Sequence, residues 1–577
     1  MKAKKRCAIY FLLLPFIFPA QSQQTPFEIS GGKESATYDQ VIRWYKDLGR
    51  KSKRIKLIEK GPTDAGEPLH LAMISADGQF NPKEWHRQKK VVLLVINGIH
   101  AGEPDGIDAS MMLARDWALQ KGLLPQNVAV ALLPVYNIGG CLNRGVNSRV
   151  NQNGPAEYGF RANAQYLDLN RDFTKCDSRE AASFSQIFQW VDPDILIDNH
   201  VSDGADYPYT MTLLTTQYEK LGPVLGDWLK KVFEPRLYAL MKKQGEEIFP
   251  YVNFNAAGPG KEMQMFYDPP RFSSGYAALF QTMAFVPETH MLKPFADRVL
   301  ATKKLISTLT NLASNSAETL IRKRNEAKDF VQRQTRFPLA WKPDSSLQTS
   351  LLFRGYAQVT RTSKATGLPQ TGFDRLHPYE QTISYYNTFK PALVVDAPLY
   401  YAVSGGWQKV IERLRWNGVK MRCLKKDSSV RAEVYRIETC KSYAEPYEGH
   451  HKNYGTAVAS DTLMILLRKG DYIINTRQPA RRYLVEMLEP SGDDSFFAWN
   501  FFDAVLQQKE GYSDYRWDEL AGGLLEKDSA LQRKLIEQRR KDPAFAENAP
   551  AQLEFLYRNS PYFEAGYRRY PVYRLLR

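Results

Sequence analysis

The sequence has few cysteines and no apolar run long enough to cross a membrane. Only 5 of its 577 residues are cysteine, too few for a disulfide-dense miniprotein. Its apolar N-terminal stretch, Cys7–Ala20, is shorter than the roughly 20 residues that span a bilayer, and no longer one follows. Internal repeats and low-complexity segments are also absent. With 43% hydrophobic, 12% aromatic and 24% charged residues, the composition is that of an ordinary globular protein.

Three common catalytic motifs are missing as well. The sequence contains no H-E-x-x-H, no G-x-S-x-G and no G-x-x-x-x-G-K-[ST]. The first absence argues against a metalloprotease whose ligands lie on one helix, the second against a serine-hydrolase elbow, and the third against a phosphate-binding loop. What chemistry the chain performs must therefore come from other residues.

The N-terminus predicts export. Residues 1–22 combine a basic start, an apolar stretch and a small residue at the end, which is typical of a cleaved signal peptide. Cys7 lies too early to be the lipid-modified cysteine of a lipoprotein. We therefore expect a secreted or periplasmic protein without a membrane span after cleavage. The formal net charge of +15 favours anionic surroundings only weakly.

Four cysteines remain after residue 22, an even number in a chain bound for an oxidising compartment. Cys423 and Cys440 are close enough in sequence for a disulfide that closes one hairpin. Isolated buried thiols are an equally good interpretation. Both alternatives stay open at this point.

The first half predicts a mixed sheet flanked by helices. Val91–Asn97 is continuously apolar, which is typical of a strand buried on both faces. A helix starting at Pro104 links it to the strand Val128–Tyr136. Other strands are predicted at Arg54–Glu59, His70–Ser75, Asp194–Asn199, Tyr209–Thr215, Ile248–Phe254 and Ala284–Pro287, and helices at Tyr38–Gly49 and from Phe295. We expect an α/β domain with a doubly wound mixed sheet over residues 23–320.

The second half has a different pattern. Residues 321–346 predict a charged helix, Arg322–Arg336, and a linker with two prolines, Phe337–Ser346. Residues 347–577 alternate turns with short β-rich runs, LLFRGYAQV, ALVVDAPLYYAV, DYIINT and RRYLVEML, before a helical, aromatic-rich end. We therefore expect a β-rich accessory domain with a helical tail.

Histidine and glutamate follow two of the predicted strands. His100 and Glu103 come directly after Val91–Asn97, and His200 comes directly after Asp194–Asn199. Because ligands bind outside the carboxyl ends of strands in open α/β sheets, we expect these side chains at one edge. Two imidazoles and one carboxylate form a catalytic zinc set with a free fourth position. The sequence thus predicts one Zn²⁺ ion at this edge, with satisfied core histidines as the alternative.

Two further segments complete an ordered set of motifs. Tyr166–Phe173 reads YLDLNRDF, and Phe285–His290 reads FVPETH. With H-x-x-E and the later strand-end His200, this order resembles the zinc metallocarboxypeptidases, the family of pancreatic carboxypeptidase A, with some likeness to its succinylglutamate desuccinylase and aspartoacylase branch. The resemblance covers roughly residues 35–315. The short distance from Glu103 to His200 departs from the pancreatic members.

The resemblance implies roles for the matched residues. His100, Glu103 and His200 match the zinc ligands. Asp168 matches the carboxylate that orients a ligand imidazole. Asn170 and Arg171 match the pair that binds the terminal carboxylate of the substrate. Glu288 matches the general base.

Two roles have competing candidates. The resemblance implies an arginine that polarises the scissile carbonyl, and Arg144, Arg149 and Arg161 are available. Arg161 is favoured because it lies shortly before the D-L-N-R segment. For the tyrosine that closes over the substrate, Tyr267 and Tyr276 compete.

Together these features predict a zinc metallocarboxypeptidase that removes residues from the C-terminus of peptides. A zinc amidase acting on N-acyl amino acids or cell-wall peptides is the main alternative, because its substrate carries a free carboxylate too. An inactive, peptidase-like binding protein is a third. We expect a peptide with a free C-terminal carboxylate as the partner, and no nucleic acid.

Overall fold

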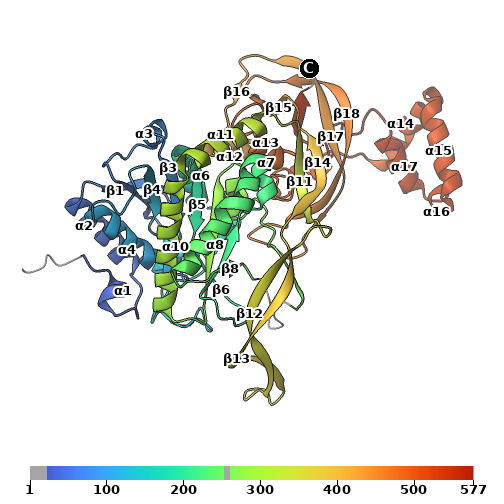
Figure 1. Ribbon diagram of the computed structural model, residues 1–577. Coiled ribbons are helices and arrows are strands. Elements are labelled where there is room, and N and C mark those ends of the chain that lie inside the picture. The colour runs from blue at the N-terminus through green and yellow to red at the C-terminus, as the bar shows by residue number, and fades with distance from the viewer. Residues whose placement is uncertain (1–22, 253–259, 576–577) are drawn as a thin grey trace, which may run out of the picture.

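The computed structural model describes residues 23–252 and 260–575, so the predicted signal peptide lies outside the described residues. A nine-stranded sheet forms the centre of the first half, in the order β1-β2-β4-β3-β5-β10-β7-β8 with β6 beside β10 (Figure 1). Neighbours from β4 to β10 run parallel, as do β7 and β8, whereas β1–β2, β2–β4 and β10–β7 are antiparallel, which confirms the predicted mixed sheet. The strands are β1 Ile55–Pro62, β2 Pro68–Ser75, β3 Val91–Ile96, β4 Val128–Leu133, β5 Ile195–Asp198, β6 His200–Ser202, β7 Met211–Thr215, β8 Phe249–Pro250 and β10 Met283–His290.

Strand β3 shows that the sheet is covered on both faces. All of its side chains are fully buried. Its odd-numbered residues belong to one hydrophobic core and its even-numbered residues to another, as the alternation of a strand requires. The first core includes helices α2 (Tyr38–Lys51), α4 (Asp105–Leu119), α8 (Glu234–Lys243) and α10 (Phe295–Asn315), and the second includes α3 (Pro82–Arg87), α6 (Arg179–Val191) and α9 (Ser273–Ala278).

The start of α4 is held close to the end of β5. Pro104 is the N-cap of α4, close to the predicted start of this helix. In the first turn, Gly106 lies so near Asn199 that an added Cβ would be 2.5 Å from the Cβ of Asn199. Any larger residue would therefore push the two strand ends apart. The glycine lets the loop after β3 and the loop after β5 meet.

The second half is rich in β-structure, as predicted. A six-stranded sheet has the order β16-β19-β15-β20-β17-β18, and smaller sheets pair β11 with β14 and β12 with β13 and β9. The long hairpin β12–β13 projects from the body (Figure 1). The strands are β9 Glu262–Gln264, β11 Arg336–Pro343, β12 Thr349–Thr362, β13 Pro369–Tyr386, β14 Phe389–Asp396, β15 Tyr400–Val403, β16 Arg422–Cys423, β17 Ser428–Ser442, β18 Asn453–Leu467, β19 Tyr472–Asn475 and β20 Val572–Leu575.

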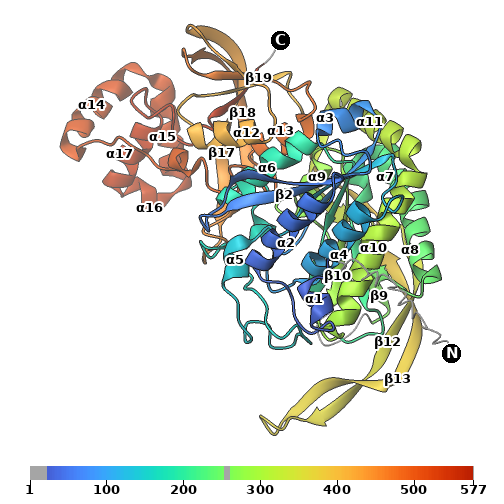
Figure 2. The ribbon, with the colours of Figure 1, turned by 90° about the vertical axis from the view of Figure 1, so that its left-hand side faces the viewer.

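The hydrophobic core is continuous between the two halves. Helices α12 (Gln408–Trp416) and α13 (Arg481–Leu488) join the second core of the first half, where α12 lies beside α6 (Figure 2). The ring of Tyr483 in α13 stacks on that of Phe280, with centroids 5.6 Å apart. The expected boundary at residue 347 therefore separates two patterns in the sequence without separating two cores.

Two local predictions for the second half are wrong. RRYLVEML is helix α13 and not a strand: all eight of its residues are buried, including the charged ones, and so short a segment does not distinguish a buried helix from a buried strand. The expected linker, Phe337–Ser346, lies largely in β11, which tolerates its prolines because β14 is its one partner among the described strands. The charged segment before it is helical as expected, in α11 (Ala317–Arg333).

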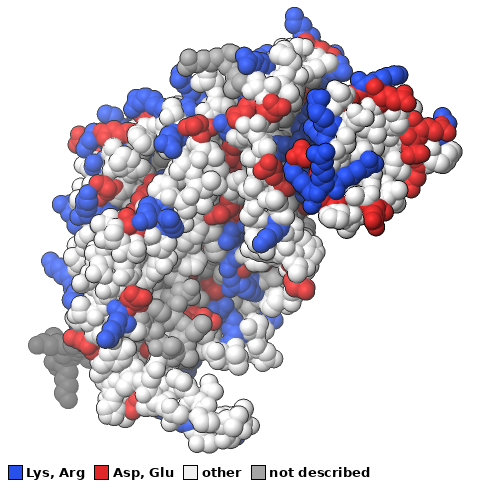
Figure 3. All heavy atoms as spheres, turned by 90° about the vertical axis from the view of Figure 1, so that its right-hand side faces the viewer, with Lys and Arg blue, Asp and Glu red and all other residues white. Residues whose placement is uncertain are grey.

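The helical segment near the C-terminus has a small core of its own, which includes Trp517 and Tyr557. It is not the end of the fold, since the chain returns to the sheet as β20. Basic side chains gather beside this segment on the face shown in Figure 3. Its helices are α14 Asp514–Lys527, α15 Ser529–Lys541, α16 Pro543–Ala546 and α17 Ala549–Arg558.

Cys423 and Cys440 are free thiols, so of the two open alternatives the hairpin disulfide is not formed. Cys141 and Cys176 are free and buried. Among the described helices, none is both long enough and apolar enough to cross a bilayer.

Candidate metal centre and active site

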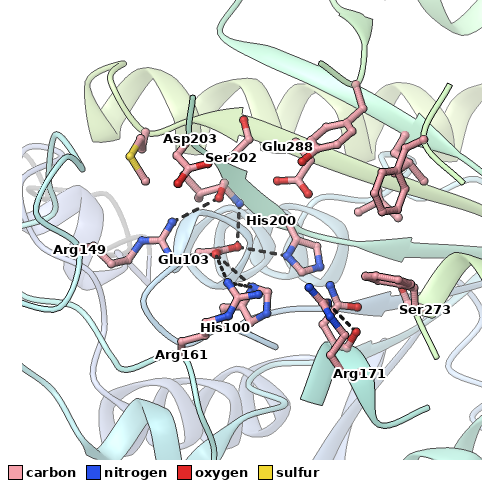
Figure 4. Close-up of a pocket in the computed structure, with 18 of the residues that line it drawn as sticks. His100, Glu103, Arg149, Arg161, Arg171, His200, Ser202, Asp203, Ser273 and Glu288 are labelled. Atoms are coloured by element: carbon pink, nitrogen blue, oxygen red, sulfur yellow. Dashed lines mark hydrogen bonds and ion pairs between the residues drawn. The ribbon is translucent and has the colours of Figure 1, made fainter. Parts of the chain in front are cut away.

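The three predicted metal ligands meet in one buried cluster. One ligand atom from each of His100, Glu103 and His200 lies within 4.8 Å of the others. The Nδ1 atoms of both imidazoles face the same carboxylate, at 3.1 Å from Oε1 for His100 and 3.1 Å from Oε2 for His200 (Figure 4). The loop between β3 and α4 supplies the first two residues, and the first position of β6 supplies the third.

Each imidazole is also oriented from its other side. The Nε2 atom of His100 lies 3.0 Å from Asp168 Oδ1, and the Nε2 atom of His200 lies 3.0 Å from Asp198 Oδ2. A carboxylate that accepts the Nε2 hydrogen leaves the Nδ1 lone pair free for a metal and raises its basicity. Asp198 was not predicted from the sequence, although its place two residues before His200 on a strand offered a signal.

This set of donors fits a zinc ion. Burial raises the pKa of Glu103, but His100 and Arg149 lower it well below its usual range. Burial lowers the pKa of His200, but Asp198 raises it well above its usual range, so a metal ion would displace imidazole protons from the cluster. Two neutral imidazoles and one anionic carboxylate are the ligands of a known class of catalytic zinc sites. The three residues would hold the ion and leave one position facing the cavity.

A cavity of about 530 Å³ opens in front of this cluster. Glu288 lines it from β10, where it pairs in register with His200. Burial raises the pKa of Glu288 to about 8, and the carboxylates of Glu103 and Asp198 add to this although His200 opposes it. A divalent cation beside it would lower that pKa. In the part of the chain that the structure describes, no residue forms a hydrogen bond or ion pair with the Glu288 carboxylate, which lies next to the candidate metal position.

Of the three candidate arginines, two line the cavity. Arg161 binds Asp168 Oδ2 through Nε and Nη2, at 3.0 and 2.8 Å, and its Nη1 lies 3.4 Å from His100 Nδ1. Arg149 donates to Glu103 Oε1 at 2.9 Å. The guanidinium of Arg144 points elsewhere and donates to backbone carbonyls, including that of Ser35 at 2.7 Å.

Asn170 and Arg171 line the same cavity from a short 3₁₀ turn, Leu169–Arg171, which Asp168 caps. The guanidinium of Arg171 lies 4.3 Å from the centroid of the Phe272 ring and donates to the Asn170 carbonyl. Within the described part of the chain, no carboxylate lies within ion-pair distance of it. The cavity therefore holds a cation whose charge is not compensated by an ion pair.

The two predicted tyrosines do not line this cavity. Tyr276 is fully buried in an aromatic cluster and donates to Asn417 at 2.6 Å. Tyr267 donates to Asp493 at 2.9 Å, away from the metal cluster. Tyr251 lines the cavity instead, and burial raises its pKa. It follows β8 within a segment that was read only as a strand, so no motif identified it.

No family model and no curated protein matches the chain. Solved structures do resemble it over about half its length. A metallo-carboxypeptidase from Burkholderia cenocepacia shares 14% identity over 49% of this chain and 70% of its own, with a TM-score of 0.36. A metallo-carboxypeptidase from Pseudomonas aeruginosa shares 15% identity over 50% of this chain and 70% of its own, with a TM-score of 0.37. Carboxypeptidase A from Helicoverpa armigera shares 14% identity over 50% of this chain and 75% of its own, with a TM-score of 0.38.

Proposed function

We propose that the protein is a zinc-dependent carboxypeptidase that releases C-terminal residues from peptides. The observation that supports this most is Arg171, a guanidinium without an ion-pair partner among the described residues, in the same cavity as the His100, Glu103 and His200 cluster. A planar, always-charged fork is suited to a carboxylate. A free C-terminus of a substrate would supply the missing anion.

The residues around the cluster have distinct roles in this proposed reaction. When bound, zinc supplies a Lewis acid and lowers the pKa of water toward about 7. Glu288 takes the proton of the attacking water and returns it to the leaving amine, because its carboxylate lines the cavity from the strand position paired with His200 and has no bonded partner among the described residues. Arg161 stabilises the negative charge that develops on the scissile carbonyl. Arg171 holds the terminal carboxylate through its guanidinium, and Asn170 donates to it through the N–H groups of its side-chain amide.

Two charged residues next to the cavity wall are already paired within the protein. Asp268 is fully buried and lies 3.3 Å from the ammonium of Lys220. Arg271 is paired with Asp494 at 2.7 Å. Neither charge is available to a substrate. Several other wall residues are apolar or carry hydroxyl groups, namely Leu214, Val286, Phe266, Phe272, Ser273 and Ser274, and the exposed carboxylate of Asp203 also lines the cavity.

The decisive experiment compares one peptide with a free and with an amidated C-terminus, using the zinc-loaded protein. We expect kcat/KM to fall by roughly two to three decades on amidation, because the half-buried guanidinium of Arg171 loses its anion. Equal rates on both peptides would contradict the proposal. Faster hydrolysis of N-acyl amino acids than of peptides would assign the site to an amidase. Wild-type protein that binds no zinc and cleaves nothing would assign it to a binding protein.

We also propose that the protein acts outside the cytoplasm. The support is the basic and then apolar sequence of residues 1–22. Cell fractionation followed by N-terminal sequencing of the mature chain would test this.

A further inference from the structure

We infer that the C-terminal half of the chain holds the wall of the substrate cavity in place, and that Asp494 is the positioning residue through which it does so. Asp494 holds the cavity wall that carries Phe272, and Phe272 in turn orients Arg171. This inference rests on the proposed role of Arg171 in holding a carboxylate.

The first step is the contact between Asp494 and Arg271. Asp494 is 2% exposed and follows α13 in the C-terminal half. Its Oδ2 accepts the backbone N–H of Arg271 at 2.8 Å, and its Oδ1 accepts the guanidinium Nη1 at 2.7 Å. One carboxylate thus fixes both the main chain and the side chain of Arg271. Hydrogen bonds to charged groups are the stronger ones, so this is a firm attachment.

The second step is the contact between neighbouring residues of that wall and Arg171. Phe272 directly follows Arg271, and its ring lies 4.3 Å from the guanidinium carbon of Arg171 and 5.5 Å from that of Arg271. Among the described residues, the Arg171 side chain has one hydrogen bond, to the carbonyl of Asn170. The face of the ring therefore determines much of the direction in which Arg171 points.

Further contacts from the C-terminal half brace the same region. Asp493 accepts the hydroxyl of Tyr267, which directly follows the wall residue Phe266. Glu448 accepts the backbone N–H of Asp168 at 2.8 Å, directly before the turn that carries Arg171. Both segments next to the cavity thus depend on residues from beyond position 440. This explains how the C-terminal half serves the site without lining the cavity itself.

The test compares two isosteric substitutions of equally buried carboxylates. Glu489 is also 2% exposed, but its partners, Tyr401 and Arg574, both lie in the C-terminal sheet. In zinc-loaded D494N we expect the ratio of kcat/KM on free-acid over amidated peptide to fall roughly ten-fold, since a charge-assisted contact is lost. In E489Q we expect the ratio to stay at the wild-type value, even if the protein is equally destabilised. Thermal unfolding and zinc content of both variants are measured alongside.

A second variant tests the same link from the cavity side. We expect F272L alone to lower the ratio of kcat/KM on free-acid over amidated peptide. Adding D494N to F272L should lower this ratio little further, because the effects of substitutions at residues in contact with one another are not additive. If the wild type discriminates between the two peptides but D494N keeps the full ratio, the inference is overturned. If the wild type does not discriminate at all, the proposed function fails instead, so the two failures are distinguishable.

Discussion

Asp198 accepts the Nε2 hydrogen of His200 at 3.0 Å, the same contact that Asp168 makes with His100. In both candidate ligand imidazoles, a carboxylate therefore fixes the ring nitrogen that faces away from Glu103. The two carboxylates come from segments that are 30 residues apart in the chain, so the symmetry of the site arises from the fold.

The D198N variant should bind zinc roughly 10- to 100-fold more weakly, because a neutral amide orients the imidazole less well and makes it less basic. Competition with a chromogenic chelator measures the affinity. Asp194 provides the matched control, since it is also buried but bonds to the backbone of Val92 and to Arg324. D194N should lose stability and keep its zinc affinity. Weakening in D194N but not in D198N would show that the orienting role is misassigned.

The E288Q variant should keep its zinc and lose activity by a factor of about 10² or more, because proton transfer is removed while the candidate ligands remain. Metal analysis and steady-state kinetics test this together. E103Q is the contrasting variant and should release the metal itself. Loss of zinc from E288Q would mean that Glu288 is a ligand rather than a base.

For R171A we expect a loss of roughly two to three decades in kcat/KM on a free-acid peptide. On the amidated peptide, R171A and the wild type should have nearly the same kcat/KM, since the carboxylate that Arg171 would bind is absent from that substrate. The two changes are therefore strongly non-additive. A full additional loss on the amidated peptide would indicate a structural role for Arg171.

Asp108 makes stability depend on pH. It is fully buried in α4, and burial raises its pKa from 3.8 to about 7 despite a hydrogen bond from the Ala36 N–H. A raised folded-state pKa gives stability that is present below the unfolded pKa and is lost as pH rises through the folded pKa. Relative to the wild type, D108N should therefore gain about 2–3 kcal/mol between about pH 5 and about pH 8, measured by denaturant unfolding.

The control for this pH effect is D77N. Lys90 and Ser75 lower the pKa of Asp77 to about 2 although burial opposes them, so both its folded and unfolded pKa lie below that pH window. D77N should therefore change the free energy of unfolding by the same amount at about pH 5 and at about pH 8. A pH-independent effect of D108N would contradict the buried-carboxylate assignment.

Much of the first half followed from its sequence because its signals are local. The uninterrupted apolar run of β3 predicted a strand covered on both faces, and strand ends predicted where His100, Glu103 and His200 meet. Tyr251 and Asp494 could not be predicted in this way. Their roles depend on contacts between segments far apart in the sequence, and nothing in the neighbouring residues marks them.

The shared core has a consequence for biosynthesis. Helices α12 and α13 complete a layer against α6, α9 and the central sheet, yet they are made only after residue 400. Until then the emerging chain exposes the apolar face that they will cover, and exposed surface of this kind is prone to aggregate. The N-terminal half therefore cannot finish folding as it is synthesised, and a polypeptide that stops at residue 320 should need a chaperone to stay in solution.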